Sequence, residues 1–140
     1  MAAVTPFRAV RPGAESAHLV AALPYDVYNR KEACEAVKGN PLSFLNIDRA
    51  ETQFPDEVDT YAGCVYEKAR ELLKARMEDG TFIQEEVPCY YIYQLTMDGR
   101  SQTGIVACSG VDDYVNQVVK KHENTREEKE LDRIRHVDTT

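Results

Sequence analysis

A tight turn in the second half of the chain constrains its fold more than any other feature. Asp98 and Gly99 separate two runs, residues 88–97 and 100–110, that are rich in tyrosine, isoleucine, threonine and valine. The dipeptide suits the positive φ angles of a type I′ turn, so this stretch predicts a β-hairpin. Because a hairpin is antiparallel, a purely parallel doubly wound sheet is excluded.

The two-residue turn also predicts the register of the hairpin. If Met97 faces Arg100, every other cross-strand pair has residue numbers with the same sum. The predicted pairs are Tyr93 with Gly104, Tyr91 with Val106, and Cys89 with Cys108. Two thiols are therefore expected to meet across the hairpin.

Two further segments are predicted to be strands. Residues 5–10 (TPFRAV) are expected to open the fold, and residues 42–47 (LSFLNI) carry apolar side chains on both faces, as a central strand does. Together with residues 90–95 and 103–108, they predict a mixed α/β (α+β) domain with one mixed sheet. A helix over residues 60–79 is expected to cover most of that sheet.

Two helices are predicted from caps and periodicity. Asn29 followed by Glu32 is a capping box for a helix over residues 30–38, and Gly39 stands where a left-handed terminating residue is needed. The helix over residues 60–79 has an apolar stripe at helical spacing, and Gly80 follows its end. We expect this stripe to be a core face. It consists of Tyr61, Val65, Ala69, Leu72 and Leu73, with Cys64 and Met77 as extensions.

Length and charge limit the class of protein. A chain of 140 residues with 43% hydrophobic residues predicts a single domain. The net charge of -7 and the sequence pI near 5.0 argue against a surface built for nucleic acid phosphates. No apolar run approaches the roughly 20 residues of a membrane span, and the N-terminal residues lack the apolar core of a signal peptide. A cytoplasmic protein is therefore expected.

The four cysteines lie far apart and never form a CxxC motif. They are Cys34, Cys64, Cys89 and Cys108. This spacing predicts neither a zinc knuckle nor a thioredoxin-type pair. Buried thiols are expected, and disulfides remain the alternative for a secreted protein.

The most highly charged stretch is KKHENTREEKELDRIRH, residues 120–136. Thr125 and Glu128 have the spacing of a capping box, which predicts a helix from Arg126 that follows a strand and the polar loop HENT. Leu131, Ile134 and Val137 give that helix a narrow apolar edge.

The opposite side of this helix supports two interpretations. Lys129, Arg133 and His136 fall at positions i, i+4 and i+7 on one face, while Glu130 and Asp132 neutralise part of their charge. The helix is either a solvated, salt-bridged one or one wall of an anion site, because a helix N-terminus offers unpaired N–H groups to an anion.

Five motifs in order resemble the N-terminal part of the DUF1015 family of bacterial and archaeal proteins. They are PFRAVRPG, LPYDV, GNPLSFLNIDRAE, DGRSQTGIVAC and VVKKHENTREEKELDRIRH. Family members are longer, so residues 1–140 are expected to be an N-terminal fragment. The family has no secure activity. Longer members carry a DGHHR-type motif similar to that of ParB-like free serine kinases, and DGRSQ of this chain is not that motif.

The resemblance implies a protein that binds a nucleotide or another phosphorylated small molecule. With ATP and Mg²⁺ it would transfer phosphate to a small hydroxylated acceptor. Without DGHHR, this segment is expected to be inactive alone, and the remainder of its own chain is an expected partner. The expected catalytic carboxylates are Glu123 and Asp26. The expected phosphate or ligand contacts are Lys121, His122, Asn124, Thr125, Arg126 and Arg133.

Two other classes of function remain open. One is a non-catalytic ligand-binding or regulatory module, because no P-loop, G-x-S-x-G or H-E-x-x-H motif occurs. The other is a metal hydrolase that uses Asp132 and His136 with His122. If the loop HENT lines a ligand site, Asp26 or residues 40–44 should face it across a cleft.

Overall fold

The computed structural model describes residues 1–120 and 126–140 of the chain as a mixed α+β protein. The chain divides into two compact units. We call Met1–Arg11 with Gln84–Asn124 the hairpin unit, and Pro12–Ile83 with Thr125–Thr140 the helical unit. The expectation that residues 1–140 form a single domain stays a prediction.

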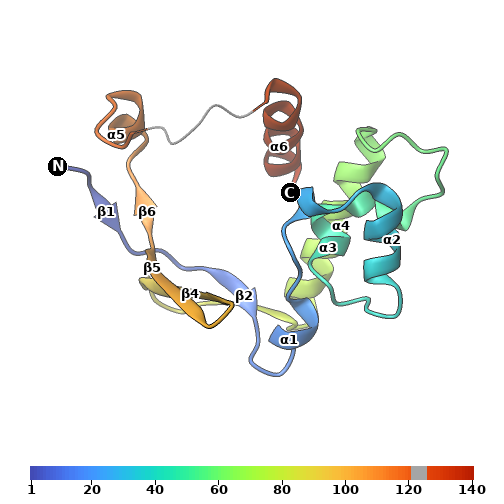
Figure 1. The fold of residues 1–140 in the computed structure, drawn as a ribbon, viewed down its shortest axis with the longest axis horizontal. Coiled ribbons are helices and arrows are strands. Elements are labelled where there is room, and N and C mark those ends of the chain that lie inside the picture. The colour runs from blue at the N-terminus through green and yellow to red at the C-terminus, as the bar shows by residue number, and fades with distance from the viewer. Residues whose placement is uncertain (121–125) are drawn as a thin grey trace. The chain divides into compact units, whose positions relative to one another are not determined.

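The hairpin unit is built around strands β4 (Tyr91–Met97) and β5 (Arg100–Val106), which Figure 1 shows as one antiparallel pair. Asp98 and Gly99 have φ angles of 50° and 76°, as a type I′ turn requires. The predicted register is confirmed, because Met97 pairs with Arg100, Tyr93 with Gly104 and Tyr91 with Val106.

The predicted pairing of Cys89 with Cys108 is wrong. The β4–β5 ladder ends at Tyr91, and beyond it both arms of the hairpin pair with the N-terminal segment. Cys89 exchanges two backbone hydrogen bonds with Phe7, of 3.1 and 2.9 Å, while Cys108 pairs with Thr5. The expectation of buried thiols is also wrong, because Cys64 and Cys108 are exposed and the other two cysteines are half-buried. All four are free.

The predicted opening strand over residues 5–10 is interrupted. Strand β1 (Val4–Thr5) pairs with β6 (Cys108–Ser109), and β2 (Val10–Pro12) pairs with β3 (Phe82–Gln84). Pro6 follows β1, and a proline has no N–H group with which to continue a ladder. Among the described residues the strands form three two-stranded sheets, so the expected single mixed sheet is wrong.

A short helix stands where a strand was expected before the loop HENT. Helix α5 (Val111–Val115) begins after Gly110 and has Asp112 and Asp113 in its first turn. Acidic side chains in this position favour a helix through its macrodipole. The sequence GVDDY therefore forms a helix start.

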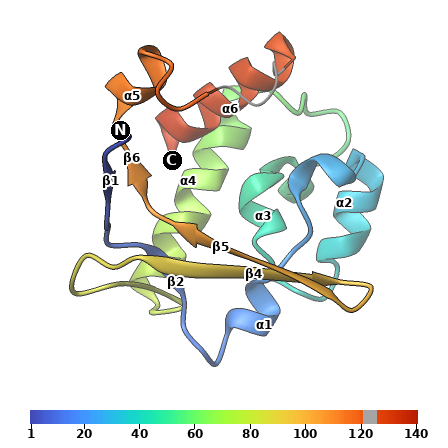
Figure 2. The same ribbon diagram turned by 60° about the vertical axis from the view of Figure 1, so that its left-hand side comes forward.

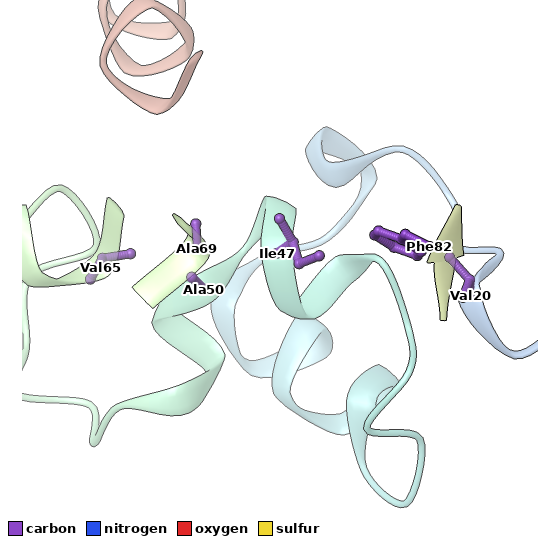
Figure 3. Close-up of a cluster of buried hydrophobic side chains, with 6 residues drawn as sticks. All are labelled: Val20, Ile47, Ala50, Val65, Ala69 and Phe82. Carbon is purple, nitrogen blue, oxygen red and sulfur yellow. The ribbon is translucent and has the colours of Figure 1, made fainter. Parts of the chain in front are cut away.

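In its described residues, the helical unit contains seven helical elements and a small core. They are α1 (Ala17–Val20), η1 (Tyr25–Val27), α2 (Arg30–Val37), α3 (Leu45–Asp48), η2 (Ala50–Gln53), α4 (Gly63–Glu78) and α6 (Glu127–Thr139), where η marks a 3-10 helix. Figure 3 shows the core side chains, with Ile47 of α3 between Phe82 on one side and Ala50 and Ala69 on the other. Val20 and Val65 complete this cluster.

The predicted caps of α2 and α4 are confirmed. The side chain of Asn29 accepts a hydrogen bond from the backbone N–H of Glu32, and the Glu32 carboxylate accepts one from the N–H of Asn29. Gly39 and Gly80 follow the two helices with φ angles of 75° and 79°. Helix α4 begins three residues later than expected, so Tyr61 lies before it and is exposed.

The predicted central strand over residues 42–47 is wrong, because this segment turns and enters helix α3. Asn46 is 4% exposed, and its amide donates to the carbonyl groups of Asn40 and Ser43, which closes the turn. Apolar side chains on both faces reflect burial on all sides of a short helix. Periodicity cannot distinguish this arrangement from a buried strand in so short a run.

In residues 1–120 and 126–140, every helix is too short or too polar to span a membrane.

Candidate functional site: a polar pocket beneath helix α6

A cavity of about 50 Å³ lies between α6 and the rest of the helical unit. Figure 2 shows α6 beside one end of α4, which contributes Val65 and Tyr66 to the lining. We call this cavity the α6 pocket. It is lined by Tyr25, Asp48, Arg49, Ala50, Glu51, Thr60, Tyr61, Val65, Tyr66, Lys129, Asp132, Arg133 and His136. Such a volume suits a few water molecules or one compact polar group of a ligand.

The charged face of α6 turns toward the pocket. Lys129, Arg133 and His136 all line it, as the spacing i, i+4, i+7 places them on one side of a helix. Asp132 lies beside them and also lines the pocket. The face that the sequence singled out is therefore an inner face of the helical unit.

Arg133 is held on three sides. Its guanidinium carbon lies 4.0 Å from the centroid of the Tyr25 ring, which is a cation–π arrangement. One terminal nitrogen lies 3.5 Å from a carboxylate oxygen of Asp48, and the other donates to Asp132 at 2.8 Å. Because both edges and one face of the guanidinium are occupied, Arg133 acts as a clamp between α6, η1 and α3.

Tyr66 and His136 add two more links between α6 and the rest of the unit. The Tyr66 hydroxyl donates to Asp132 at 2.9 Å, and Nε2 of His136 lies 3.0 Å from the carbonyl oxygen of Ile47. Burial, together with the hydrogen bond to Asp132, raises the pKa of Tyr66 to about 12. The phenol therefore stays protonated and remains a donor at neutral pH.

Asp48 is a half-buried carboxylate that lines the pocket. Burial raises the pKa of Asp48, although the positive charges of Arg133 and His136 act in the opposite direction. These cations therefore compensate only part of the cost of removing the carboxylate from water.

A second arginine fixes the backbone of the PYDV segment. Arg49 pairs with Glu51, which is only 2% exposed, and it donates to the carbonyl oxygens of Tyr25 at 3.0 Å and Tyr28 at 2.8 Å. These bonds hold the Tyr25 ring where α6 meets it. The pairing also leaves the Arg49 charge compensated within the unit.

Lys129 differs from the two arginines of the pocket. Its Nζ atom lies 6.0 Å from the centroid of the Tyr25 ring, and within the described part of the chain it has no ion-pair partner. Arg49 and Arg133 are each paired with a carboxylate. Lys129 is therefore the pocket cation with the most capacity left for an external anion.

The structure brings some of the predicted site residues to the pocket and leaves others apart. Arg133 lines it, whereas Arg126 is an exposed residue at the N-terminal end of α6. Asp26 is exposed in η1, and Tyr25 beside it lines the pocket instead. Residues 40–44 do not line the pocket. The predictions for Lys121, His122, Glu123, Asn124 and Thr125 fall outside the described residues.

The predicted start of the last helix needs a small correction. Helix α6 begins at Glu127, and Arg126 is its N-cap residue without a side-chain capping bond. The capping role predicted for Thr125 falls outside the described residues. The first turn holds Glu127, Glu128 and Glu130, which stabilise the positive end of the helix dipole.

Sequence reasoning did not predict Tyr25, Asp48, Arg49, Glu51 or Tyr66 as site residues, although all five line the pocket. One signal for two of them was present, because Asp48 and Glu51 are carboxylates at the end of an otherwise apolar segment, LSFLNIDRAE. Buried carboxylates of this kind are paired or functional. Tyr66 had no such signal, because it lies outside the apolar stripe predicted for the helix over residues 60–79.

The metal-hydrolase alternative finds little support in this geometry. Asp132 and His136 both line the pocket, but Asp132 is bonded to Tyr66 and Arg133. Across residues 1–120 and 126–140, no group of three or more His, Cys, Asp or Glu side chains has a metal-binding arrangement. His122, the third expected ligand, lies outside this range.

Comparison with known proteins gave one result. A family model described as "Protein of unknown function (DUF1015)" matches residues 4–140, which is nearly the full length of the chain. No curated protein and no solved structure matches the chain.

Proposed function

Because the chain belongs to the DUF1015 family, a family of proteins of unknown function, we propose its function from the geometry of the α6 pocket. The pocket binds a small polar molecule, and Lys129 contacts an anionic group of that molecule, such as a phosphate. This retains the phosphorylated ligand that the family resemblance implies and transfers its main contact from the HENT loop to α6.

The observation that carries the proposal is the unequal pairing of the pocket cations. Arg49 and Arg133 are each paired with a carboxylate, whereas Lys129 lines the cavity without such a partner in the described ranges. A half-buried ammonium of this kind gains more from a ligand anion than a solvated one does, because the local dielectric is lower. An anion near Lys129 would also lie close to the Tyr25 ring.

Arg133 has a positioning role in this proposal. Its contacts with Tyr25, Asp48 and Asp132 hold α6 and set the place of Lys129 one helical turn earlier. Direct binding of phosphate by Arg133 would require it to give up at least one of these contacts. The ligand contacts expected of Arg126 and of Lys121, His122, Asn124 and Thr125 stay predictions.

Phosphate transfer from ATP with Mg²⁺ stays a prediction. The catalytic roles of Glu123 and Asp26 stay predictions as well. The pocket carboxylates do not fit a magnesium site as they stand, because Asp48 and Asp132 both face the Arg133 guanidinium. We therefore derive no reaction step through the metal. The observed groups support a binding site more directly than a catalytic one, which favours the ligand-binding or regulatory module.

A titration with inorganic phosphate and a set of phosphomonoesters tests the proposal. Chemical-shift changes in the ¹⁵N NMR spectrum should cluster at Tyr25, Asp48 and Lys129. Replacement Lys129→Gln should weaken the affinity by roughly tenfold or more, as expected when a charged hydrogen bond is lost.

The matched control is Lys74→Gln on α4. Lys74 is exposed, does not line the α6 pocket, and forms no ion pair with the described residues. Lys74→Gln makes the same change of charge as Lys129→Gln and should leave the affinity for phosphate and phosphomonoesters unchanged. Equal weakening by both replacements would show a non-specific charge effect and would refute a site at Lys129. Absence of any response at the pocket to every anion would refute the proposal as well.

A further inference from the structure

Helix α6 is attached to the helical unit in an unusual orientation. Its polar residues face inward, toward the pocket, while Leu131, Ile134 and Val137 are 49%, 55% and 76% exposed. An amphipathic helix in a globular protein normally turns its apolar side to the core. The main source of helix stability in proteins is therefore missing at this contact.

The burial of individual residues leads to the same conclusion. Helix α6 has no buried residue, whereas α4 has Val65, Tyr66, Ala69 and Arg76 buried. A hydrophobic contact stabilises in proportion to the apolar area that it removes from water. The attachment of α6 must therefore depend on its polar contacts.

These polar contacts are few and come from three elements. Arg133 reaches Tyr25 of η1 and Asp48 of α3, Asp132 accepts the hydrogen bond from Tyr66 of α4, and His136 meets the carbonyl oxygen of Ile47. Every residue in these contacts except Ile47 lines the α6 pocket. Most of the groups that hold the helix in place therefore also line the cavity.

We propose that α6 is a releasable lid of the α6 pocket, held closed by polar contacts and opened when those contacts break. Breaking the contacts of Arg133 and Tyr66 detaches a helix of 13 residues, a length that is marginal in water without packing. This inference rests on the proposed function in one respect only, namely that the pocket beneath the lid holds a ligand. Its test needs no ligand, so the failure of one proposal is distinguishable from the failure of the other.

Hydrogen exchange of backbone amides in the 140-residue chain tests the lid directly. Replacement Arg133→Gln should speed exchange of the α6 amides by about three- to tenfold, the effect of losing one partly buried ion pair and one cation–π contact. Exchange in α4 should not change. Raising NaCl to 1 M should speed α6 exchange in the unmodified protein, because the Debye length then falls to about 3 Å.

Three further variants make the result decisive. Tyr66→Phe removes only the hydroxyl that binds Asp132 and should release α6 selectively, even if Arg133→Gln disturbs folding. Ile134→Ala trims the exposed apolar edge and should leave α6 exchange unchanged. Arg70→Gln, at an exposed position of α4 that does not line the pocket, should have no effect.

A cysteine inside the pocket shows whether detachment opens the cavity. Ala50 lines the pocket and is 2% exposed, so Ala50→Cys, in a chain whose native cysteines are replaced by serine, should react slowly with a thiol reagent. Arg133→Gln should raise that rate in step with α6 exchange. The proposal is overturned if neither Arg133→Gln nor Tyr66→Phe changes α6 exchange, if α4 exchanges equally fast, or if Ile134→Ala releases the helix.

Discussion

The guanidinium of Arg133 lies over the ring of Tyr25, with its carbon 4.0 Å from the ring centroid. This contact joins the charged C-terminal helix to the PYDV segment near the start of the chain. Arg49 holds the backbone at both ends of η1 through the carbonyl groups of Tyr25 and Tyr28, and thereby positions the segment that carries the ring. The α6 pocket depends on this support.

Replacement Tyr25→Leu should destabilise the helical unit by about 1 kcal/mol, because it removes the cation–π contact and keeps an apolar side chain. Urea denaturation followed by circular dichroism measures the change. Tyr93→Leu is the control, since Tyr93 is 58% exposed on β4, and it should change the free energy of unfolding by less than about 0.5 kcal/mol. Equal effects of the two replacements would contradict the contact.

Replacement Ile47→Ala should cost about 3 kcal/mol, since Ile47 is 2% exposed within the core cluster and truncation leaves a cavity there. The same truncation at the exposed Ile134 should cost much less. Thermal unfolding of both variants against the unmodified chain gives the comparison. A small loss for Ile47→Ala would show that the segment is not packed as helix α3.

Replacement Asn29→Ala should cost about 1 kcal/mol, because both hydrogen bonds of the capping box of α2 depend on Asn29 or on the geometry that it fixes. Exchange of the Glu32 amide should speed up most, since this N–H loses its acceptor. Asn116→Ala, at the end of α5, changes an asparagine that caps no helix N-terminus. A loss of stability in both variants alike would argue against a specific role of the cap.

The stability of the chain should fall between pH 10 and about pH 12 because of Tyr66. The folded-state pKa of about 12 lies above the ordinary value of 10, so the folded protein keeps a proton that the unfolded chain releases. The stability from this group is fully present below pH 10 and is lost as the pH rises through 12. The expected loss is on the order of 2 kcal/mol.

Urea unfolding at pH 9 and at pH 11.5 checks this expectation. Tyr66→Phe has no group to titrate and should lose less stability over that interval than the unmodified chain. Tyr93→Phe removes an exposed tyrosine and should follow the unmodified chain. The same slope for all three proteins would mean that Tyr66 titrates normally.

Local features of the sequence were sufficient for several parts of the fold. The Asp98–Gly99 turn fixed the hairpin register, because the two residues leave no freedom in which strand positions face each other. Asn29, Glu32 and Gly39 delimited α2, since helix caps depend on neighbouring backbone groups alone. The helical spacing of Lys129, Arg133 and His136 gave the face of α6 that lines the pocket.

Only the tertiary structure decided which residues pack against these local elements. The sequence alone determined that Arg133 lies on a charged helix face, and the fold decided that Tyr25, Asp48 and Tyr66 surround that face. Likewise, residues 42–47 form a turn that leads into helix α3 and no strand, because Asn46 satisfies the backbone of a buried turn. Local patterns depend on the spacing of residues that are neighbours in the sequence. The pocket depends instead on contacts between segments that are far apart in the sequence, and burial and charge pairing select those contacts.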